Sequence, residues 1–178
     1  MASLVSVRPG VHTATWNAVG LGITTGEGFK LKFRPARIPI NNTNLYGDCL
    51  IDGIHKGAGM VQLLATFKEW NAAVQAAIWP WGAASPPTLD GTIGTIGKLL
   101  TDYAKPLILT AQAGSPAAAA SAGGVSTANT FTAGMAVLAP ENDVEMLFGA
   151  VETDVAVLFD LYLYDDSGTK RFFKWSSV

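Results

Sequence analysis

Residues 46–82 read YGDCLIDGIHKGAGMVQLLATFKEWNAAVQAAIWPWG and carry the densest structural signals in the chain of 178 residues. Residues 48–55 and 60–68 have the apolar patterns of β-strands, and the glycine-bearing segment 56–59 between them predicts a hairpin turn. After the second strand the apolar positions recur at helical spacing, which predicts an amphipathic helix of roughly three turns that ends at Pro80. The stretch therefore predicts a strand, a turn, a second strand and a helix.

Three tryptophans flank the predicted helix: Trp70 precedes it, and Trp79 and Trp81 follow it. Asn71 is the expected N-cap, because its side chain can accept a hydrogen bond from a backbone amide of the first turn. A helix this short is stable only when its apolar side packs against a sheet. We expect Trp70, Trp79 and Trp81 to seal that packing as core aromatics rather than to stack on a ligand.

Residues 29–34, FKLKFR, alternate three apolar side chains with Lys30, Lys32 and Arg34. A period of two predicts a half-buried strand with one solvated, positively charged face. Such a face suits a phosphate or an acidic neighbour, and an ordinary solvated strand face has the same pattern.

The remainder of the chain predicts one mainly β domain over residues 1–178, with neither an internal repeat nor a second domain. Further strands are expected at residues 11–16, 37–40, 107–110, 130–138, 144–151 and 155–164, followed by a hairpin turn at 165–168 and a returning strand at 170–175. A short helix before Pro106 should place Ile96, Leu99, Leu100 and Tyr103 on one face. Residues 111–128 are rich in Ala, Gly and Ser and predict an exposed, mobile loop.

The composition favours a protein that buries much of its surface against other chains. Hydrophobic residues make up 49% and charged residues 15%, compared with about 25% charged residues in an average domain. The alternative is a domain that is merely rich in Ala and Gly. The net charge of −2 and the scattered cations argue against nucleic-acid binding, which needs a basic stripe.

Catalytic and metal-binding chemistry has little support in the sequence. Cys49 stands alone, which excludes an internal disulfide and a cysteine-based zinc site, and two histidines are too few for most metal clusters. Asp48 and Asp52 should share a strand face, where they could hold a cation, but no third ligand is evident. We therefore predict a protein that is not an enzyme, with no catalytic, cofactor-binding or metal-binding residues.

Neither a signal peptide nor a membrane span is evident. Arg8, Pro9 and Gly10 interrupt the apolar start of the chain, and no stretch approaches the roughly 18 apolar residues of a membrane helix. The sequence therefore predicts a protein that is made in a reducing cytoplasm, or assembled there before release.

The succession LYGDCLIDGIHKGAGMVQLLATFKEWNAAVQAAIWPWG resembles the core of bacteriophage tail tube (major tail) proteins. In that family a strand with a YG motif leads through a glycine turn into an apolar strand, an acidic-aromatic pair and a short helix that ends in Trp-Pro. Residues 94–111, GTIGKLLTDYAKPLILTA, and residues 155–175, VAVLFDLYLYDDSGTKRFFKW, are similar to the family's downstream elements.

The resemblance implies a β-sandwich or small barrel with a flanking short α-helix, whose hairpin strands join a β-barrel shared by six copies. It implies a structural virion protein: hexameric rings stack into a hollow tube that conducts DNA during ejection, without cofactor or catalysis. The implied partners are further copies, tape-measure and other tail proteins, and a sheath in a contractile tail. DNA passes without specific binding, no membrane is involved, and the tail is assembled in the host cytoplasm.

For a tube of this kind the lumen should be weakly acidic or neutral, so that DNA slides without adhering. Asp48 and Asp52 are then expected to line the lumen, and Lys30, Lys32 and Arg34 to lie at contacts between subunits or rings. Two other functions remain open. One is a ring-forming tail-completion or baseplate hub protein of the same fold, and the other is a β-sandwich module that binds carbohydrate or protein through exposed tryptophans.

Overall fold

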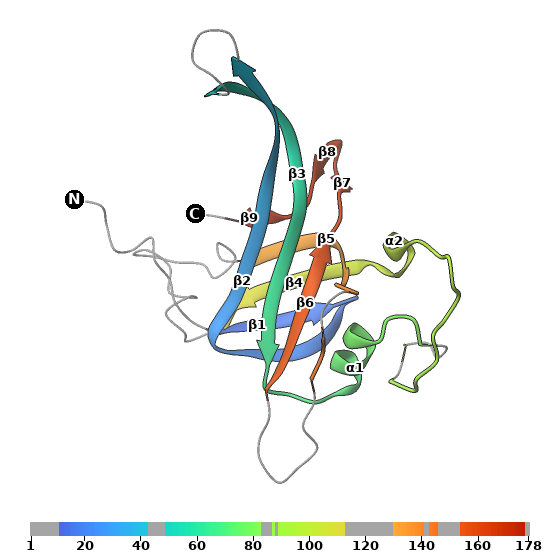
Figure 1. Cartoon of the computed structure of the whole chain (residues 1–178). Helices are drawn as coiled ribbons and strands as arrows, with labels where there is room; N and C mark the ends of the chain where they lie inside the picture. Colours follow the sequence, from blue (N-terminus) through green and yellow to red (C-terminus); the bar gives the residue numbers. More distant parts are fainter. Residues whose placement is uncertain are drawn as a thin grey trace, which may run out of the picture.

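Figure 1 shows a computed structural model of the chain, which describes residues 11–42, 49–82, 87, 89–112, 130–140, 143–145 and 154–176. The fold is mainly β, as the sequence predicts. The strands in the described residues are β1 (His12–Trp16), β2 (Val19–Asn42), β3 (Cys49–Phe67), β4 (Lys105–Ala111), β5 (Thr130–Leu138), β6 (Val155–Leu161), β7 (Tyr164–Asp166), β8 (Thr169–Arg171) and β9 (Lys174–Ser176). The helices are α1 (Ala72–Ile78) and α2 (Leu100–Tyr103).

Six antiparallel strands close into a barrel. Their order is β4–β1–β2–β3–β6–β5, and β5 pairs back with β4, so the base of the sheet has few free edges. β9 joins the edge of β5 beside β6. Along β4 and β6, buried side chains alternate with more exposed ones, as expected of a barrel wall. Examples of the buried side chains are Leu107 and Leu109 of β4, and Val157 and Phe159 of β6.

The helix α1 packs at the end of the barrel opposite the hairpin that projects at the top of Figure 1. It is shorter than expected, with 7 residues, and the apolar side predicted from its spacing is buried. Asn71 is its N-cap, because the Asn71 side-chain oxygen accepts a 2.9 Å hydrogen bond from the backbone amide of Val74. The predicted cap is confirmed.

The prediction of a hairpin turn at residues 56–59 is wrong. β3 runs without a break from Cys49 to Phe67, and its hairpin partner is β2. Gly57 has a left-handed φ of 90° and lies beside register shifts, where β3 has one residue more than β2. Glycine allows such a bulge as readily as it allows a turn, so the strand continues.

The segments 29–34 and 37–40 form one strand rather than two. Pro35 pairs with Ala58 and Pro39 pairs with Gly53 inside the long β2–β3 ladder. Proline has no backbone amide to donate, so it is tolerated where that side of the strand has no partner. No strand in the described part of the chain pairs with β2 on the side away from β3 at these positions.

The C-terminal strands are shorter than the sequence predicts and divide differently. β6 ends at Leu161, and the predicted turn at 165–168 joins the short strands β7 and β8. Of the returning strand expected at 170–175, Lys170 and Arg171 pair back on β7, whereas Lys174 and Trp175 belong to β9, which joins β5. Residues 144–145 form no strand, and most of the segments 144–151 and 111–128 lies outside the described residues.

Candidate assembly surface

The outer half of the β2–β3 hairpin projects beyond the barrel as a two-stranded ribbon (Figure 1). β2 pairs with β1 only up to Ile23, and β3 pairs with β6 only from Gln62 to Phe67. Above these points both ribbon edges lack a partner strand among the residues that the structure describes. An isolated two-stranded ribbon is only marginally stable, and its open edges are templates for pairing with another chain.

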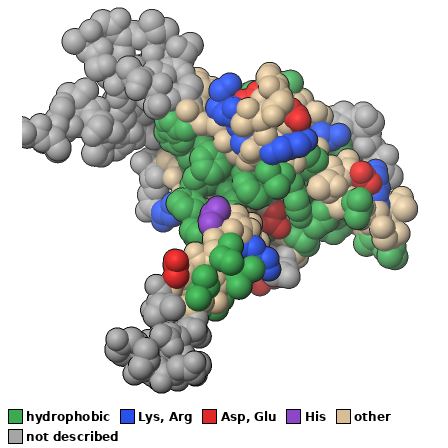
Figure 2. Space-filling model, turned by 90° about the horizontal axis from the view of Figure 1, so that it is seen from above, with side chains coloured by type: hydrophobic (Ala, Val, Ile, Leu, Met, Phe, Trp, Pro, Cys, Tyr) green, Lys and Arg blue, Asp and Glu red, His purple; other side chains and the backbone are tan. Residues whose placement is uncertain are grey.

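One face of this ribbon carries an isoleucine cluster. Ile38 pairs directly with Ile54, and Ile40 pairs with Asp52, so the four side chains share a face. Ile38, Ile40 and Ile54 are 49%, 39% and 56% exposed, which is unusual for side chains of this kind. Figure 2 shows hydrophobic side chains gathered on the projecting ribbon. We call these four residues the isoleucine face.

The basic residues predicted from sequence continue the isoleucine face towards the barrel. Lys30, Lys32 and Arg34 alternate on β2 in step with Ile38 and Ile40, because the extra residues at the register shifts in between belong to β3. All three cations are exposed, as a solvated strand face requires. Their row and the isoleucine face therefore form one continuous outer surface of the hairpin.

Asp52 and Asp48 were expected to share a face on the grounds of their spacing. Asp52 is exposed, and its Oδ1 accepts a 2.7 Å hydrogen bond from the amide of Gly53. Asp48 lies outside the described residues. The register shifts between these two positions, where Ile51 is the extra residue, so a spacing of four no longer dictates a shared face.

The two tryptophans that follow α1 pack together. Trp79 and Trp81 are half-buried and meet edge to face at 5.5 Å between ring centroids. Trp81 contacts the Tyr103 ring of α2 in the same way. Trp70 is 42% exposed. Trp79 and Trp81 of the expected seal thus pack together, with Tyr103 as a partner that the sequence did not indicate.

The segment between the two helices, residues 91–99, carries three strongly exposed aliphatic side chains. Ile93, Ile96 and Leu99 are 68%, 85% and 69% exposed. The sequence predicted Ile96 and Leu99 on the packed face of a helix, but α2 begins only at Leu100 and their side chains lie in solvent. We call residues 91–99 the GTI loop, after its repeated Gly-Thr-Ile.

The GTI loop is held in place by its neighbours. The indole nitrogen of Trp79 donates a 2.7 Å hydrogen bond to the carbonyl oxygen of Thr92. Asp90 Oδ1 accepts hydrogen bonds from the amide and hydroxyl of Thr92, at 3.0 and 2.6 Å, and this bonding lowers the pKa of the Asp90 carboxyl. At Gly94, whose φ is 64°, an added Cβ would lie 2.7 Å from the Trp81 carbonyl oxygen.

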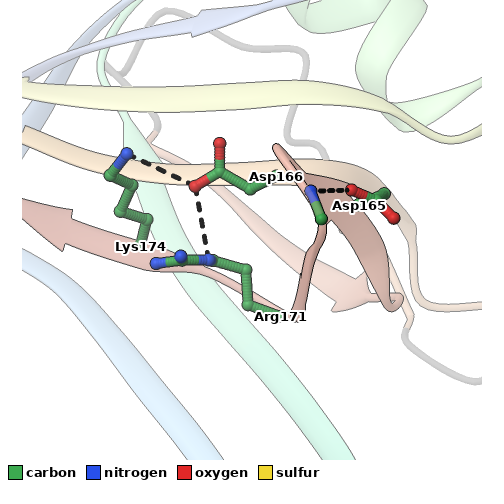
Figure 3. A network of polar contacts seen from close by, with 5 residues as sticks. Asp165, Asp166, Arg171 and Lys174 are labelled. Atoms are coloured by element: carbon green, nitrogen blue, oxygen red, sulfur yellow. Dashed lines mark hydrogen bonds and ion pairs between the residues drawn. The ribbon is translucent and has the colours of Figure 1, made fainter.

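A separate polar network joins β7, β8 and β9. Asp166 Oδ2 lies 3.3 Å from Arg171 Nε and 3.3 Å from Lys174 Nζ (Figure 3). Asp165 lies beside it, 3.0 Å from Lys170 Nζ, and accepts a hydrogen bond from the amide of Gly168 that closes the turn. The hydrogen bond and the ion pairs connect the turn to its flanking strands, which is a structural role typical of Asp in turns.

The described residues bring together no group of three or more His, Cys, Asp and Glu side chains that would hold a metal ion. His12 is buried against Phe29, with ring centroids 5.0 Å apart, whereas His55 is exposed on the ribbon. Gln62 donates a 2.9 Å hydrogen bond to Asp160 in a hollow of about 360 Å³ at the foot of the ribbon.

Comparison of the chain with protein-family models found no match, and a search of the curated proteins also found none. None of the helices in the part of the chain that the structure describes is long and apolar enough to cross a membrane.

Proposed function

We propose that this protein is a structural virion protein, the subunit of a bacteriophage tail tube, whose hexameric rings stack into a hollow tube that conducts DNA during ejection. The observation that carries the proposal is the β2–β3 ribbon, which leaves the barrel with both edges open and an aliphatic face in solvent. Such a ribbon is completed by strands of neighbouring copies, which remove the open edges.

The low charge of the chain supports an assembling role. Hydrophobic residues reach 49% of the composition, and exposed aliphatic side chains gather on the ribbon and on the GTI loop. Monomeric proteins rarely leave large apolar patches in water, and subunit interfaces bury them. The row of Lys30, Lys32 and Arg34 lies on the same outer surface as the isoleucines, which supports its predicted place at contacts between subunits or rings.

In this proposal the protein acts by shape and performs no catalysis. Its partners are copies of itself, tape-measure and other tail proteins, and the sheath of a contractile tail. It resides in the virion, after assembly in the host cytoplasm, and DNA passes through the tube without specific binding. Trp79 and Trp81 do not form a sugar-binding platform, because they pack edge to face and leave no flat ring pair for stacking.

The test is the assembly state of the purified protein, measured by light scattering after gel filtration and by negative-stain microscopy. Tubes of indefinite length are expected, whereas isolated rings would indicate the tail-completion or baseplate hub protein. Replacement of Ile38 and Ile54 by Asp should abolish tubes and leave folded monomers, because burying two unpaired carboxylates in an interface is costly. The matched control is Leu163→Asp, at a residue 53% exposed outside the ribbon. Wild-type protein that stays monomeric at every concentration would overturn the proposal.

A further inference from the structure

The GTI loop has the properties of a preformed contact surface. Its three aliphatic side chains point into solvent, yet its backbone is tied to Trp79 and shaped by the hydrogen bonds between Asp90 and Thr92. A loop that is already ordered loses little conformational entropy when it binds. Exposed aliphatic side chains on an ordered loop bring no benefit to the monomer and become favourable when a partner covers them.

The isoleucine face has the complementary composition. Both surfaces present aliphatic side chains, and each has one charged residue directly among them. On the ribbon it is the Asp52 carboxylate, opposite Ile40. On the loop it is the Lys98 ammonium, next to Leu99 in the chain and held 4.5 Å above the centre of the Tyr103 ring. The two surfaces therefore match in polarity, and the single charges among their aliphatic side chains are opposite in sign.

The loop and the isoleucine face of one molecule cannot meet each other. Figure 1 shows the ribbon projecting at the top, while the segment between α1 and α2 extends from the opposite side of the lower barrel. A contact between these surfaces must therefore join two copies. Since the two patches are different, the contact is head to tail, and repeating it generates a ring or a filament rather than a closed dimer.

We infer that the GTI loop of each subunit docks on the isoleucine face of the next copy of this chain, with Lys98 of one copy paired to Asp52 of the other. The inference rests on the proposed function and deepens it, because it names the two surfaces that build the polymer. It also moves Asp52 from the predicted lumen to a subunit contact. The physical reason is that three exposed isoleucines share its strand face, and an aliphatic face suits an interface better than a hydrated channel.

A charge-swap experiment tests the contact. The full-length variants Asp52→Lys and Lys98→Glu place like charges opposite each other, so each should raise the critical concentration for assembly roughly tenfold or more. The double variant D52K/K98E restores opposite charges and should return the critical concentration close to that of the wild type. Assembly is followed by light scattering, and circular dichroism checks that every variant is folded. Asp154→Lys, an exposed acid outside both surfaces, is the control for net charge.

Cross-linking gives a second readout that does not depend on the electrostatics. In a Cys49→Ser background, chains with Ile54→Cys are mixed with chains with Ile96→Cys, and oxidation should join one chain of each kind. Single variants that assemble like the wild type, or a double variant that remains defective, would overturn the inferred contact and leave the tube proposal intact. Wild-type protein that never assembles would overturn both.

Discussion

The indole nitrogen of Trp16 in β1 donates a 3.1 Å hydrogen bond to the carbonyl oxygen of Ala136 in β5, across 120 residues of sequence. Both residues are buried, and β1 and β5 are separated by β4 around the barrel. The bond therefore ties two walls together through the interior, rather than along a ladder between neighbouring strands. A substitution at Trp16 can therefore measure how much this contact across the barrel contributes to stability.

Trp16→Phe keeps an aromatic ring in the core but removes the donor to Ala136. The unsatisfied carbonyl should lower the free energy of unfolding by about 1–3 kcal/mol, measured by urea denaturation monitored by circular dichroism. Trp70→Phe is the matched control, because Trp70 is 42% exposed and the change should be smaller. Equal stability losses in the two variants would show that the buried bond contributes nothing specific.

The Tyr164 ring of β7 lies against Gly134 of β5, in the space that any larger side chain would fill. Gly134→Ala should force the ring away and destabilise the fold by about 1–3 kcal/mol, the usual range for overpacking. In the Gly134→Ala/Tyr164→Ala double variant the clash is absent, so its loss should be smaller than the sum of the two single losses. Additive losses in thermal or urea unfolding would contradict the proposed contact.

Removing the N-cap of α1 should weaken the covered end of the barrel. Asn71→Ala deletes the acceptor of the Val74 amide and should lower the free energy of unfolding by about 1 kcal/mol. Asn71→Asp retains an acceptor and places a negative charge at the helix N-terminus, so it should keep most of the stability. If Asn71→Asp proved as unstable as Asn71→Ala in urea, the capping explanation would be refuted.

The basic row on β2 should matter for assembly and not for folding. Reversing Lys30, Lys32 and Arg34 to Glu should prevent tube formation while the monomer stays folded, because all three side chains are exposed. Arg37→Glu is the control, since Arg37 lies on the other face of β2. Negative-stain microscopy and circular dichroism separate the two effects. Tubes formed by the triple variant would exclude the row from the contacts.

At the turn between β7 and β8, the carboxylate of Asp165 should contribute to stability in a way that depends on pH in the acid range. The hydrogen bond from Lys170 and that from the amide of Gly168 hold the pKa of Asp165 below its ordinary value of 3.8. A lowered folded-state pKa means that the ion pair stabilises the fold above the unfolded pKa, and that this contribution is lost as the pH falls through the folded pKa. In an NMR titration Lys170→Ala should raise the pKa of Asp165. Lys174→Ala, which removes a partner of Asp166 instead, should leave it unchanged.

Local patterns in the sequence predicted much of the barrel. Apolar composition marked β4, and alternating apolar side chains marked β6, because successive residues of a strand face the core and the exterior in turn. Asn71 and Pro80 marked the ends of α1, and the run Asp165-Asp166-Ser167-Gly168 marked a turn, since these signals act within a few residues. The exposed, alternating cations at Lys30 and Lys32 were also predicted correctly.

The features that carry the proposed function were decided by tertiary structure. Gly57 and Gly59 permit either a turn or a bulge. The bulge was selected because β3 pairs with β2 on both sides of these glycines. The resulting register places Ile54 opposite Ile38, 16 residues away in the chain. Similarly, the sequence indicated aliphatic residues at Ile96 and Leu99 but not their exposure, which follows from the late start of α2. Short-range chemistry determined the elements, and long-range pairing determined which surfaces remain for another copy.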